Sequence, residues 1–362
     1  MPTILYIAEK LDMAEAIVIT SAQQEGAKVL IVLPDGDPYL QALQEKSIEC
    51  VAYSFGRWKC REGILLIRKI VDEHEVDIVH CLRGAYALAN AITALKRRAA
   101  VKLVAIRDNT CPVSRFRRSD RLTILQPRID RIVCDSQRVR THLEESGVTR
   151  DRLITIYKGH DVHWYDRYEP ADLREFDIPA GEFVVGCVAT MRPRKGVDHL
   201  VQAVKYLPPS PRVHLLLVGE VLDERVEDLA LTNNTVHQIH FAGPRNDSAQ
   251  LMGACNVFVM PSVWGEGNPR ALMEAMSQAV PVVVTAIGAM REVVEHRVSG
   301  RIVRSADEKE LARAITSFLR DPRVAHQYGQ AARKRVREHF SADRTVDQTM
   351  RMYEGLVSPA SE

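Results

Sequence analysis

The chain lacks the sequence features of several large protein classes. Its seven cysteines are scattered singly, with no Cys-x-x-Cys pair, which disfavours a disulfide framework and a zinc cluster and favours a reducing cytoplasm. The start, MPTILYIAEK, reaches charge too early for a signal peptide, and no apolar run is long enough to span a membrane. No G-x-G-x-x-G follows a predicted strand, which disfavours a nicotinamide-dependent oxidoreductase. We therefore expect a cytoplasmic protein without a resident cofactor or metal.

The net charge of +2 conceals an uneven distribution. Residues 57–152 hold 21 Lys and Arg against 12 Asp and Glu, whereas residues 1–56 hold 3 against 8. The basic excess is concentrated in RRAAVK (97–102) and SRFRRSDR (114–121). Such clusters indicate a solvated surface, or a surface that meets anionic lipid headgroups or an anionic acceptor. Nucleic acid is disfavoured because no RNA- or DNA-binding motif accompanies them.

Short apolar runs typical of buried strands alternate with helical patterns along the chain. In the first half these runs are TILYIA (3–8), KVLIVL (28–33), IECVAY (48–53), VDIVHC (76–81), VKLVAI (101–106) and RIVCDS (131–136). In the second half they are EFVVGCVAT (182–190), RVHLLLVG (212–219), VHQIHFAG (236–243), CNVFVMPS (255–262), AVPVVVTA (279–286) and GRIVR (300–304). The alternation predicts an α/β protein with two doubly wound, Rossmann-like parallel sheets.

The length of 362 residues fits two domains of roughly 150 to 200 residues each. Between the two series of strands, YKGHDVHWYDRYEP (157–170) lacks helical and strand periodicity and ends in proline, which is typical of a linker. From residue 307 onward the pattern is helical. We expect an N-terminal domain at 1–165, a C-terminal domain at 166–340 and a final helix at 341–362 that packs back on the N-terminal domain.

The stretch PSVWGEGNPRALMEAM (261–276) follows a predicted strand at the sheet edge where open α/β folds bind ligands. Glycines flank Glu266, and Pro269 stands near the first turn of a predicted helix, whose free amides suit a phosphate or sugar oxygen. The carboxylates of Glu266 and Glu274 could each accept hydrogen bonds from neighbouring sugar or ribose hydroxyls. The alternative is that Glu266 only favours a helix N-terminus and that Glu274 is an ordinary helix former.

A second constellation, TMRPRKG (190–196), follows the first strand of the second half. Three cations at the mouth of a ligand site, Arg192, Arg194 and Lys195, could neutralise a diphosphate leaving group without a metal ion. The alternative is a basic surface loop.

Taken in order, the stretches of the second half resemble family 4 glycosyltransferases. The similar segments are VGCVATMRPRKGVDHLVQAV, HLLLVGE, IHFAGPRND, ACNVFVMPSVWGEGNPRALMEAMSQAVPVVVTAIGAMREVV and SGRIV, within residues 183–303. The N-terminal half is similar only in its strand-helix rhythm and its ending, SGV…ITIYKGHD. The family comprises retaining, nucleotide-sugar-dependent enzymes with the GT-B fold, in which two Rossmann-like domains face a central cleft.

The resemblance implies roles for the glutamate loop. Glu266 matches the glutamate that holds hydroxyls of the donor sugar, and Glu274 matches the one that holds the nucleotide ribose. Gly267, Asn268 and Pro269 match the turn whose amides meet the donor.

The resemblance also implies a phosphate site. Lys195 matches the family's phosphate-binding lysine, and Arg192 is its arginine partner, although many members place that arginine where this chain has Thr190. The implied catalytic set is Arg192, Lys195 and Glu266, acting on a donor of UDP or GDP type.

The N-terminal half departs from the family. The segment after the first strand, AEKLDMAEAI, has no glycine loop, and the usual histidine after VKLVAI is replaced by Arg107 and Asp108. His80 matches a family histidine position, although a histidine at a strand end is also a common structural residue. His80 and Asp108 are the acceptor-side candidates.

We therefore expect a retaining glycosyltransferase that moves a sugar from a nucleotide diphosphate to a glycan or lipid-linked acceptor, in bacterial envelope glycan or lipopolysaccharide-type synthesis. The N-terminal domain would hold the acceptor and the C-terminal domain the donor. The basic N-terminal surface favours peripheral contact with the inner face of the membrane. Two alternatives stay open: a GT-B protein that binds the donor but is catalytically impaired, and a GT-B nucleotide-sugar epimerase.

Overall fold

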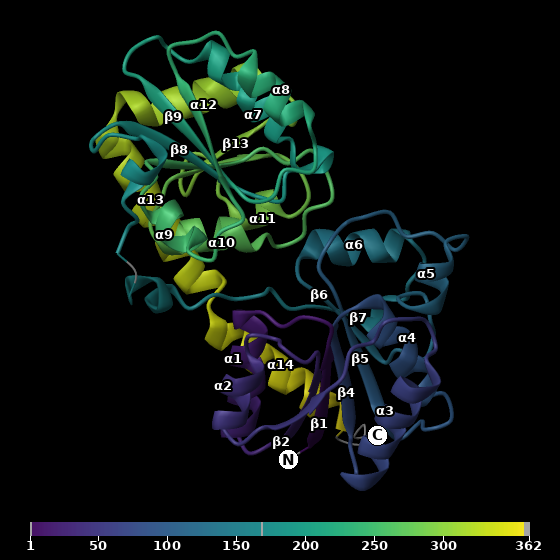
Figure 1. Cartoon of the computed structure of the whole chain (residues 1–362). Coiled ribbons are helices and arrows are strands. Elements are labelled where there is room, and N and C mark those ends of the chain that lie inside the picture. Colours follow the sequence, from purple (N-terminus) through teal and green to yellow (C-terminus); the bar gives the residue numbers. More distant parts are fainter. Residues whose placement is uncertain (1, 168, 358–362) are drawn as a thin grey trace. The chain divides into compact units, whose positions relative to one another are not determined.

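The computed structural model describes residues 2–167 and 169–357, which form two compact units (Figure 1). Within those residues, unit 1 comprises the parts of the chain in 1–108, 112–159 and 342–362, and unit 2 comprises those in 109–111 and 160–341. The final helix therefore returns the chain to unit 1. The sequence analysis placed domain boundaries after residues 165 and 340 and assigned the acceptor to the first domain and the donor to the second. Those boundaries and assignments stay predictions.

Unit 1 is built on a seven-stranded parallel sheet with the order β3-β2-β1-β4-β5-β6-β7. Its strands are β1 (Thr3–Ala8), β2 (Lys28–Leu33), β3 (Glu49–Ala52), β4 (Ile78–Arg83), β5 (Lys102–Arg107), β6 (Arg131–Cys134) and β7 (Leu153–Thr155). The sequence predicted all but β7, whose three residues are too few to show a periodicity. The strand order reverses between β1 and β4, and sheets of this kind bind ligands outside the carboxyl ends of their strands at such a point.

Helices cover both faces of the unit 1 sheet, so its strands are continuous apolar runs. One face packs against α3 (Arg61–Glu73), α4 (Ala85–Ala94) and α6 (Gln137–Glu145). The other packs against α1 (Met13–Gln24), α2 (Leu40–Glu45) and α14 (Ala342–Val357). The short helix α5 (Arg118–Leu122) and the 3-10 helix η1 (Arg150–Arg152) lie in connecting segments.

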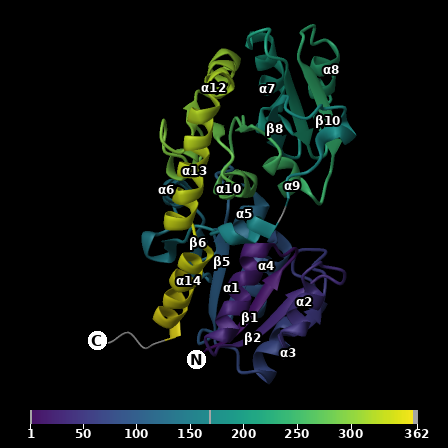
Figure 2. The ribbon, with the colours of Figure 1, turned by 90° about the vertical axis from the view of Figure 1, so that its left-hand side faces the viewer.

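Helix α14 belongs to the core of unit 1 although it is the last element of the chain. It lies beside α1 (Figure 2) and buries Val346, Met350 and Tyr353 in the same apolar cluster as Ile4 and Tyr6 of β1. This burial holds the end of the chain on the sheet through the hydrophobic effect.

Unit 2 contains a six-stranded parallel sheet with the order β10-β9-β8-β11-β12-β13. Its strands are β8 (Phe183–Val188), β9 (Val213–Val218), β10 (Gln238–Gly243), β11 (Val257–Met260), β12 (Val282–Thr285) and β13 (Arg301–Val303), and all six lie where the sequence predicted them. Its helices are α7 (Val197–Ala203), α8 (Arg225–Leu231), α9 (Ser248–Gly253), α10 (Arg270–Ser277), α11 (Met290–Val293), α12 (Glu308–Arg320) and α13 (Pro322–His339), with 3-10 helices η3 (Leu173–Phe176), η4 (Pro193–Lys195) and η5 (Val204–Tyr206).

The predicted linker contains regular structure that its sequence pattern did not indicate. The 3-10 helix η2 (Val162–Arg167) begins where the backbone N–H of His163 donates to the Asp161 carboxylate at 2.9 Å. Tyr165 of this helix is buried, and its hydroxyl lies 3.1 Å from Nδ1 of His160. The side-chain cap and the buried aromatic ring thus stabilise a helix that is too short to show a helical period in the sequence.

The helices of residues 2–167 and 169–357 include none with both the length and the apolar composition needed to cross a bilayer.

Candidate active site

The loop after β11 holds Glu266 in a buried position. The side chain is 6% exposed, and Oε1 accepts a hydrogen bond from Oγ of Ser262 at 2.8 Å. The same oxygen lies 2.5 Å from Nζ of Lys195. A buried charge is costly unless it is paired and hydrogen-bonded, and this carboxylate is both.

Lys195 comes from η4, which follows β8, and the two loops are joined through their backbones. The N–H of Val263 donates to the carbonyl oxygen of Arg194 at 2.8 Å. The next residue, Gly196, adopts a φ of +62°, and a Cβ there would lie 2.3 Å from the carbonyl oxygen of Pro261. Only glycine fits this approach, which fixes the distance between the lysine loop and the glutamate loop.

The structure distinguishes the two candidate arginines of the lysine loop. Arg194 places Nη1 3.5 Å from Oε1 of Glu266, so two cations flank one carboxylate. Arg192 is exposed at the start of η4. A role for Arg192 toward phosphate stays a prediction, and Arg194 joins it as a candidate that the predicted catalytic set omitted.

The second glutamate of the motif lies in α10. Glu274 is 4% exposed, and its Oε1 accepts from Nε of Arg270 at 2.5 Å. Pro269 is the N-cap of this helix, and Gly267 and Asn268 precede it. The E-x7-E spacing thus spans a loop and the first turns of a helix, as expected, whereas the roles of these residues toward a donor stay predictions.

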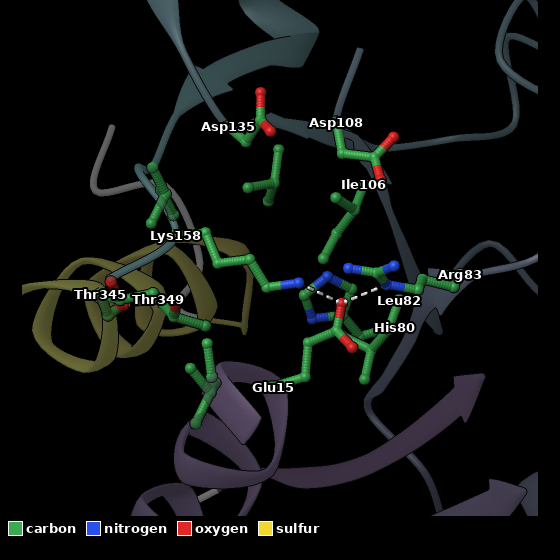
Figure 3. A pocket seen from close by; sticks show the side chains of 14 residues that line it. Glu15, His80, Leu82, Arg83, Ile106, Asp108, Asp135, Lys158, Thr345 and Thr349 are labelled. Carbon is green, nitrogen blue, oxygen red and sulfur yellow. Dashed lines mark hydrogen bonds and ion pairs between the residues drawn. The ribbon is translucent and has the colours of Figure 1, made fainter. Parts of the chain in front are cut away.

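Unit 1 contains a cavity of about 50 Å³ at the carboxyl ends of β4 to β7 (Figure 3). It is lined by Ala14, Glu15 and Val18 of α1, His80, Leu82 and Arg83 of β4, Ile106 and Asp108 at the end of β5, Val133 and Asp135 at the end of β6, Ile156 and Lys158 after β7, and Thr345 and Thr349 of α14. The two acceptor-side candidates, His80 and Asp108, therefore line one cavity.

His80 is a neutral hydrogen-bonding group of this cavity. Its side chain is 3% exposed, and burial lowers its pKa to about 3. Its Nδ1 lies 2.6 Å from the Tyr353 hydroxyl, which donates in turn to Tyr6 at 3.1 Å. Because that hydroxyl has one proton, Nδ1 is the donor to Tyr353 and Nε2 is an acceptor. Among the residues that the structure describes, Nε2 has no hydrogen-bond partner.

Two cations that line the cavity, Arg83 and Lys158, are paired with the carboxylates of Asp12 and Glu15, and these four residues are called the rim. Arg83 lies 2.7 Å from Asp12 and 3.0 Å from Glu15, and Lys158 lies 2.9 Å from Glu15 and also bonds Asp12. Burial raises the pKa of Asp12, but the positive charges of Lys158 and Arg83 outweigh it, so the pKa is lowered overall.

The sequence pattern did not reveal this rim. The available signal was positional: Asp12 and Glu15 form the capping box that begins α1, Arg83 ends β4, and Lys158 follows β7. All four therefore lie at the carboxyl edge of one parallel sheet.

The segment that lacks the family's glycine loop supplies a carboxylate to a helix instead. Glu9 Oε1 accepts from the backbone N–H groups of Tyr86 and Ala87 at 3.1 and 3.0 Å, at the start of α4. A Cβ on Gly84 would lie 2.2 Å from this carboxylate. The N-terminus of α4, where an anion is favoured, is thus filled by the chain's own side chain.

Comparison with known families decides the classification. Residues 169–335 match the model "Glycosyl transferases group 1", and residues 18–164 match "Glycosyltransferase Family 4". The chain belongs to the family 4 glycosyltransferases. Both halves match, including the N-terminal half, in which the sequence resembled the family only in its strand-helix rhythm and its ending.

Two relatives illustrate the range of this glycosyltransferase family. Alpha-maltose-1-phosphate synthase of Mycolicibacterium smegmatis is 30% identical over 222 residues, which are 56% of this chain and 57% of the relative. An Escherichia coli enzyme named UDP-Gal:alpha-D-GlcNAc-diphosphoundecaprenol alpha-1,3-galactosyltransferase is 24% identical over 318 residues, which are 83% of this chain and 80% of the relative. The match thus spans a little over half of the first relative.

A solved structure shows the fold class of this chain. Anabaena HepE in complex with UDP-glucose has a TM-score of 0.80 and 23% identity, over 98% of this chain and all of the other. The two parallel sheets are those of the GT-B fold, as the sequence predicted.

Proposed function

We propose that the protein is a retaining glycosyltransferase that moves a sugar from a nucleotide diphosphate to an acceptor hydroxyl. The observation that carries the proposal is the buried Glu266, held against Lys195 and Arg194 at the carboxyl edge of the unit 2 sheet. A carboxylate can accept from sugar hydroxyls while neighbouring cations meet a diphosphate. UDP is the favoured nucleotide, because HepE was solved with UDP-glucose and the name of the E. coli relative includes UDP-Gal.

In this proposal the chain's own cations stabilise the leaving group. Lys195, together with Arg192 or Arg194, would balance the charge that develops on the departing phosphate. Glu266 would orient the sugar so that the acceptor attacks from the face that the diphosphate leaves. No side chain forms a covalent bond to the sugar.

The second glutamate would bind the ribose after exchanging a partner. Glu274 is bonded to Arg270, whose side chain is 59% exposed. Ribose hydroxyls would replace this exposed guanidinium as donors to the carboxylate. Gly267, Asn268 and Pro269 would present the amides that precede α10 to the donor.

On the acceptor side, we assign the cavity of unit 1 to the acceptor. His80 offers an unused acceptor nitrogen, and Asp108 lies at the end of β5 on the same cavity. A glycan or lipid-linked molecule in bacterial envelope or lipopolysaccharide-type synthesis fits the acceptor in the E. coli relative's name, alpha-D-GlcNAc-diphosphoundecaprenol. The reaction would take place in the cytoplasm, at the inner face of the membrane.

The first test is a thermal-shift screen of UDP-, GDP- and ADP-sugars against the wild type, Glu274→Ala and Glu227→Ala. Glu227 is an exposed glutamate of α8 and serves as the control. A ligand at 100 times its Kd stabilises a protein by about 2.7 kcal/mol, so one nucleotide class should raise the melting temperature by several degrees. The shift should shrink in Glu274→Ala and persist in Glu227→Ala.

The same screen discriminates the alternatives. If no nucleotide sugar shifts the wild type at millimolar concentration, the donor site proposed for unit 2 is wrong. A shift without transfer or donor hydrolysis would identify a catalytically impaired donor-binding protein. Conversion of the donor into an isomeric nucleotide sugar without an acceptor would identify an epimerase.

A further inference from the structure

The segment that connects β5 to α5 projects one aromatic side chain into solvent. Phe116 is 98% exposed, the largest value among large hydrophobic side chains of the described residues. The next most exposed large hydrophobic side chain among the described residues of unit 1 is Leu65, at 50%. A fully exposed phenylalanine has an unfavourable free energy in water and indicates a surface that meets an apolar phase.

The exposure of Phe116 is imposed by an ordered turn. The N–H of Ser114 donates to the buried Asp120 carboxylate at 3.0 Å, and the N–H of Phe116 donates to Oγ of Ser114 at 3.2 Å. Nη1 of Arg117 donates to the carbonyl oxygen of Pro112 at 2.9 Å. The turn is closed by its own side chains, so Phe116 stays at its tip.

Arginines flank Phe116 in the sequence. Arg115, Arg118 and Arg121 are exposed, and within residues 2–167 and 169–357 no ion pair involves them. Arg117 lies 3.8 Å from Asp120, a long contact to a carboxylate that the turn already uses. The surface therefore combines a fixed aromatic tip with several exposed guanidinium groups.

We propose that residues 112–121, the Phe116 loop, dock onto an anionic lipid bilayer. Phe116 would enter the interfacial region, where aromatic rings are favoured, and the arginines would bind lipid phosphates. The buried apolar area of the ring and the attraction of the arginines to anionic lipid both strengthen binding to the membrane. The inference rests on the proposed function in one respect, because a lipid-linked acceptor would lie in the same bilayer.

The test is co-sedimentation of the full chain with vesicles, without donor or acceptor. Phosphatidylglycerol vesicles should bind the wild type at low ionic strength, and phosphatidylcholine vesicles should not. Each arginine near an anionic surface contributes about fivefold to affinity, so R115Q/R118Q/R121Q should weaken binding by about 100-fold. The control R313Q/R320Q/R323Q makes the same charge change at exposed positions of unit 2 and should bind like the wild type.

The aromatic tip has its own pair of variants. Phe116→Ser should weaken vesicle binding by about tenfold, because one buried aromatic side chain is lost. Phe116→Trp should retain binding, and its fluorescence should shift to the blue on anionic vesicles as the ring leaves water. Leu65→Ser, on α3, is the control for loss of an exposed apolar side chain.

Three results would overturn the inference. The first is equal binding of the wild type to anionic and neutral vesicles. The second is unchanged vesicle binding of the triple arginine variant. The third is a Phe116→Ser variant that binds vesicles like the wild type but no longer transfers sugar to a water-soluble acceptor. The last would assign the loop to the acceptor. Vesicle binding without any nucleotide-sugar effect on the melting temperature would instead refute the proposed function and leave the docking surface standing.

Discussion

The lysine and glutamate loops of unit 2 and the cavity of unit 1 lie at the same edge of two similar sheets, yet they are built differently. In unit 2, the backbones of two loops are hydrogen-bonded to each other and meet at Gly196. In unit 1, the rim comes from α1, β4 and the segment after β7, joined through side-chain ion pairs. One region is fixed by its backbone, and the other depends on charge pairing.

The two regions also differ in charge. In unit 2, Lys195 and Arg194 share the single carboxylate of Glu266, which leaves a net positive charge. In unit 1, Arg83 and Lys158 are balanced by Asp12 and Glu15, and two further carboxylates, Asp108 and Asp135, line the same cavity. The first arrangement favours a polyanion such as a diphosphate, whereas the second disfavours one. The comparison teaches that similar sheets can carry opposite charge balances at their carboxyl edges.

The largest expected effect tests the positive side of this comparison. Lys195→Ala should lower kcat by about 100-fold to 1000-fold, the usual result of losing one charged transition-state contact. Lys205→Ala, an exposed lysine of the same unit, should leave kcat unchanged. Steady-state rates with a fixed donor measure both. Near-normal turnover in Lys195→Ala would remove the lysine from the mechanism.

A glycine pair tests the backbone contact. Gly196→Ala should lower the free energy of unfolding by about 3 kcal/mol, through a positive φ and a collision with the Pro261 carbonyl. Gly181 has a φ of +88°, and a Cβ added there would have no atom within 4 Å, so Gly181→Ala should cost only about 1 kcal/mol. Urea unfolding of both variants measures the difference. Equal losses would mean that the loops do not meet at Gly196.

The cavity of unit 1 predicts a pH dependence of stability. Burial keeps His80 neutral in the folded protein, with a pKa of about 3, whereas the unfolded chain binds a proton near pH 6.5. The unfolded state therefore gains protons first, and the free energy of unfolding falls by about 1.4 kcal/mol per pH unit as pH drops from 6.5 toward 3. Urea titrations across this range should show that His80→Gln removes this contribution and that His326→Gln, at an exposed position, does not. The same slope in all three proteins would contradict a buried neutral ring.

The smallest expected effect concerns two helix N-termini. Glu9 fills the start of α4, whereas α10 has no acidic residue in its first turn. Glu9→Gln keeps an oxygen acceptor but loses the charge, so the unfolding free energy should fall by about 0.5 to 1 kcal/mol at low salt. Glu25→Gln, at the exposed end of α1, should not reproduce this loss in chemical denaturation. No difference between the two would show that the α4 dipole is already screened.

The sequence predicted most strands because buried parallel strands are continuous apolar runs. It failed where the pattern was too short, at β7 and at η2, and there packing and a side-chain cap determine the structure. It predicted the glutamate and lysine loops because each of these motifs is local in the chain. It missed the carboxylates of the unit 1 rim, Asp12 and Glu15, because they are far in sequence from the lysine that pairs with them. Lys158 lies 146 residues after Asp12 and 143 residues after Glu15.

The sequence by itself determined the α/β alternation, the E-x7-E loop and the candidate phosphate lysine, since each rests on residues close together in the chain. Tertiary structure alone decided which arginine meets Glu266, how His80, Asp108 and α14 share a cavity, and which aromatic side chain stays in solvent. The physical reason is that these features depend on burial and on charges brought together by chain segments far apart in sequence, for which no local period exists.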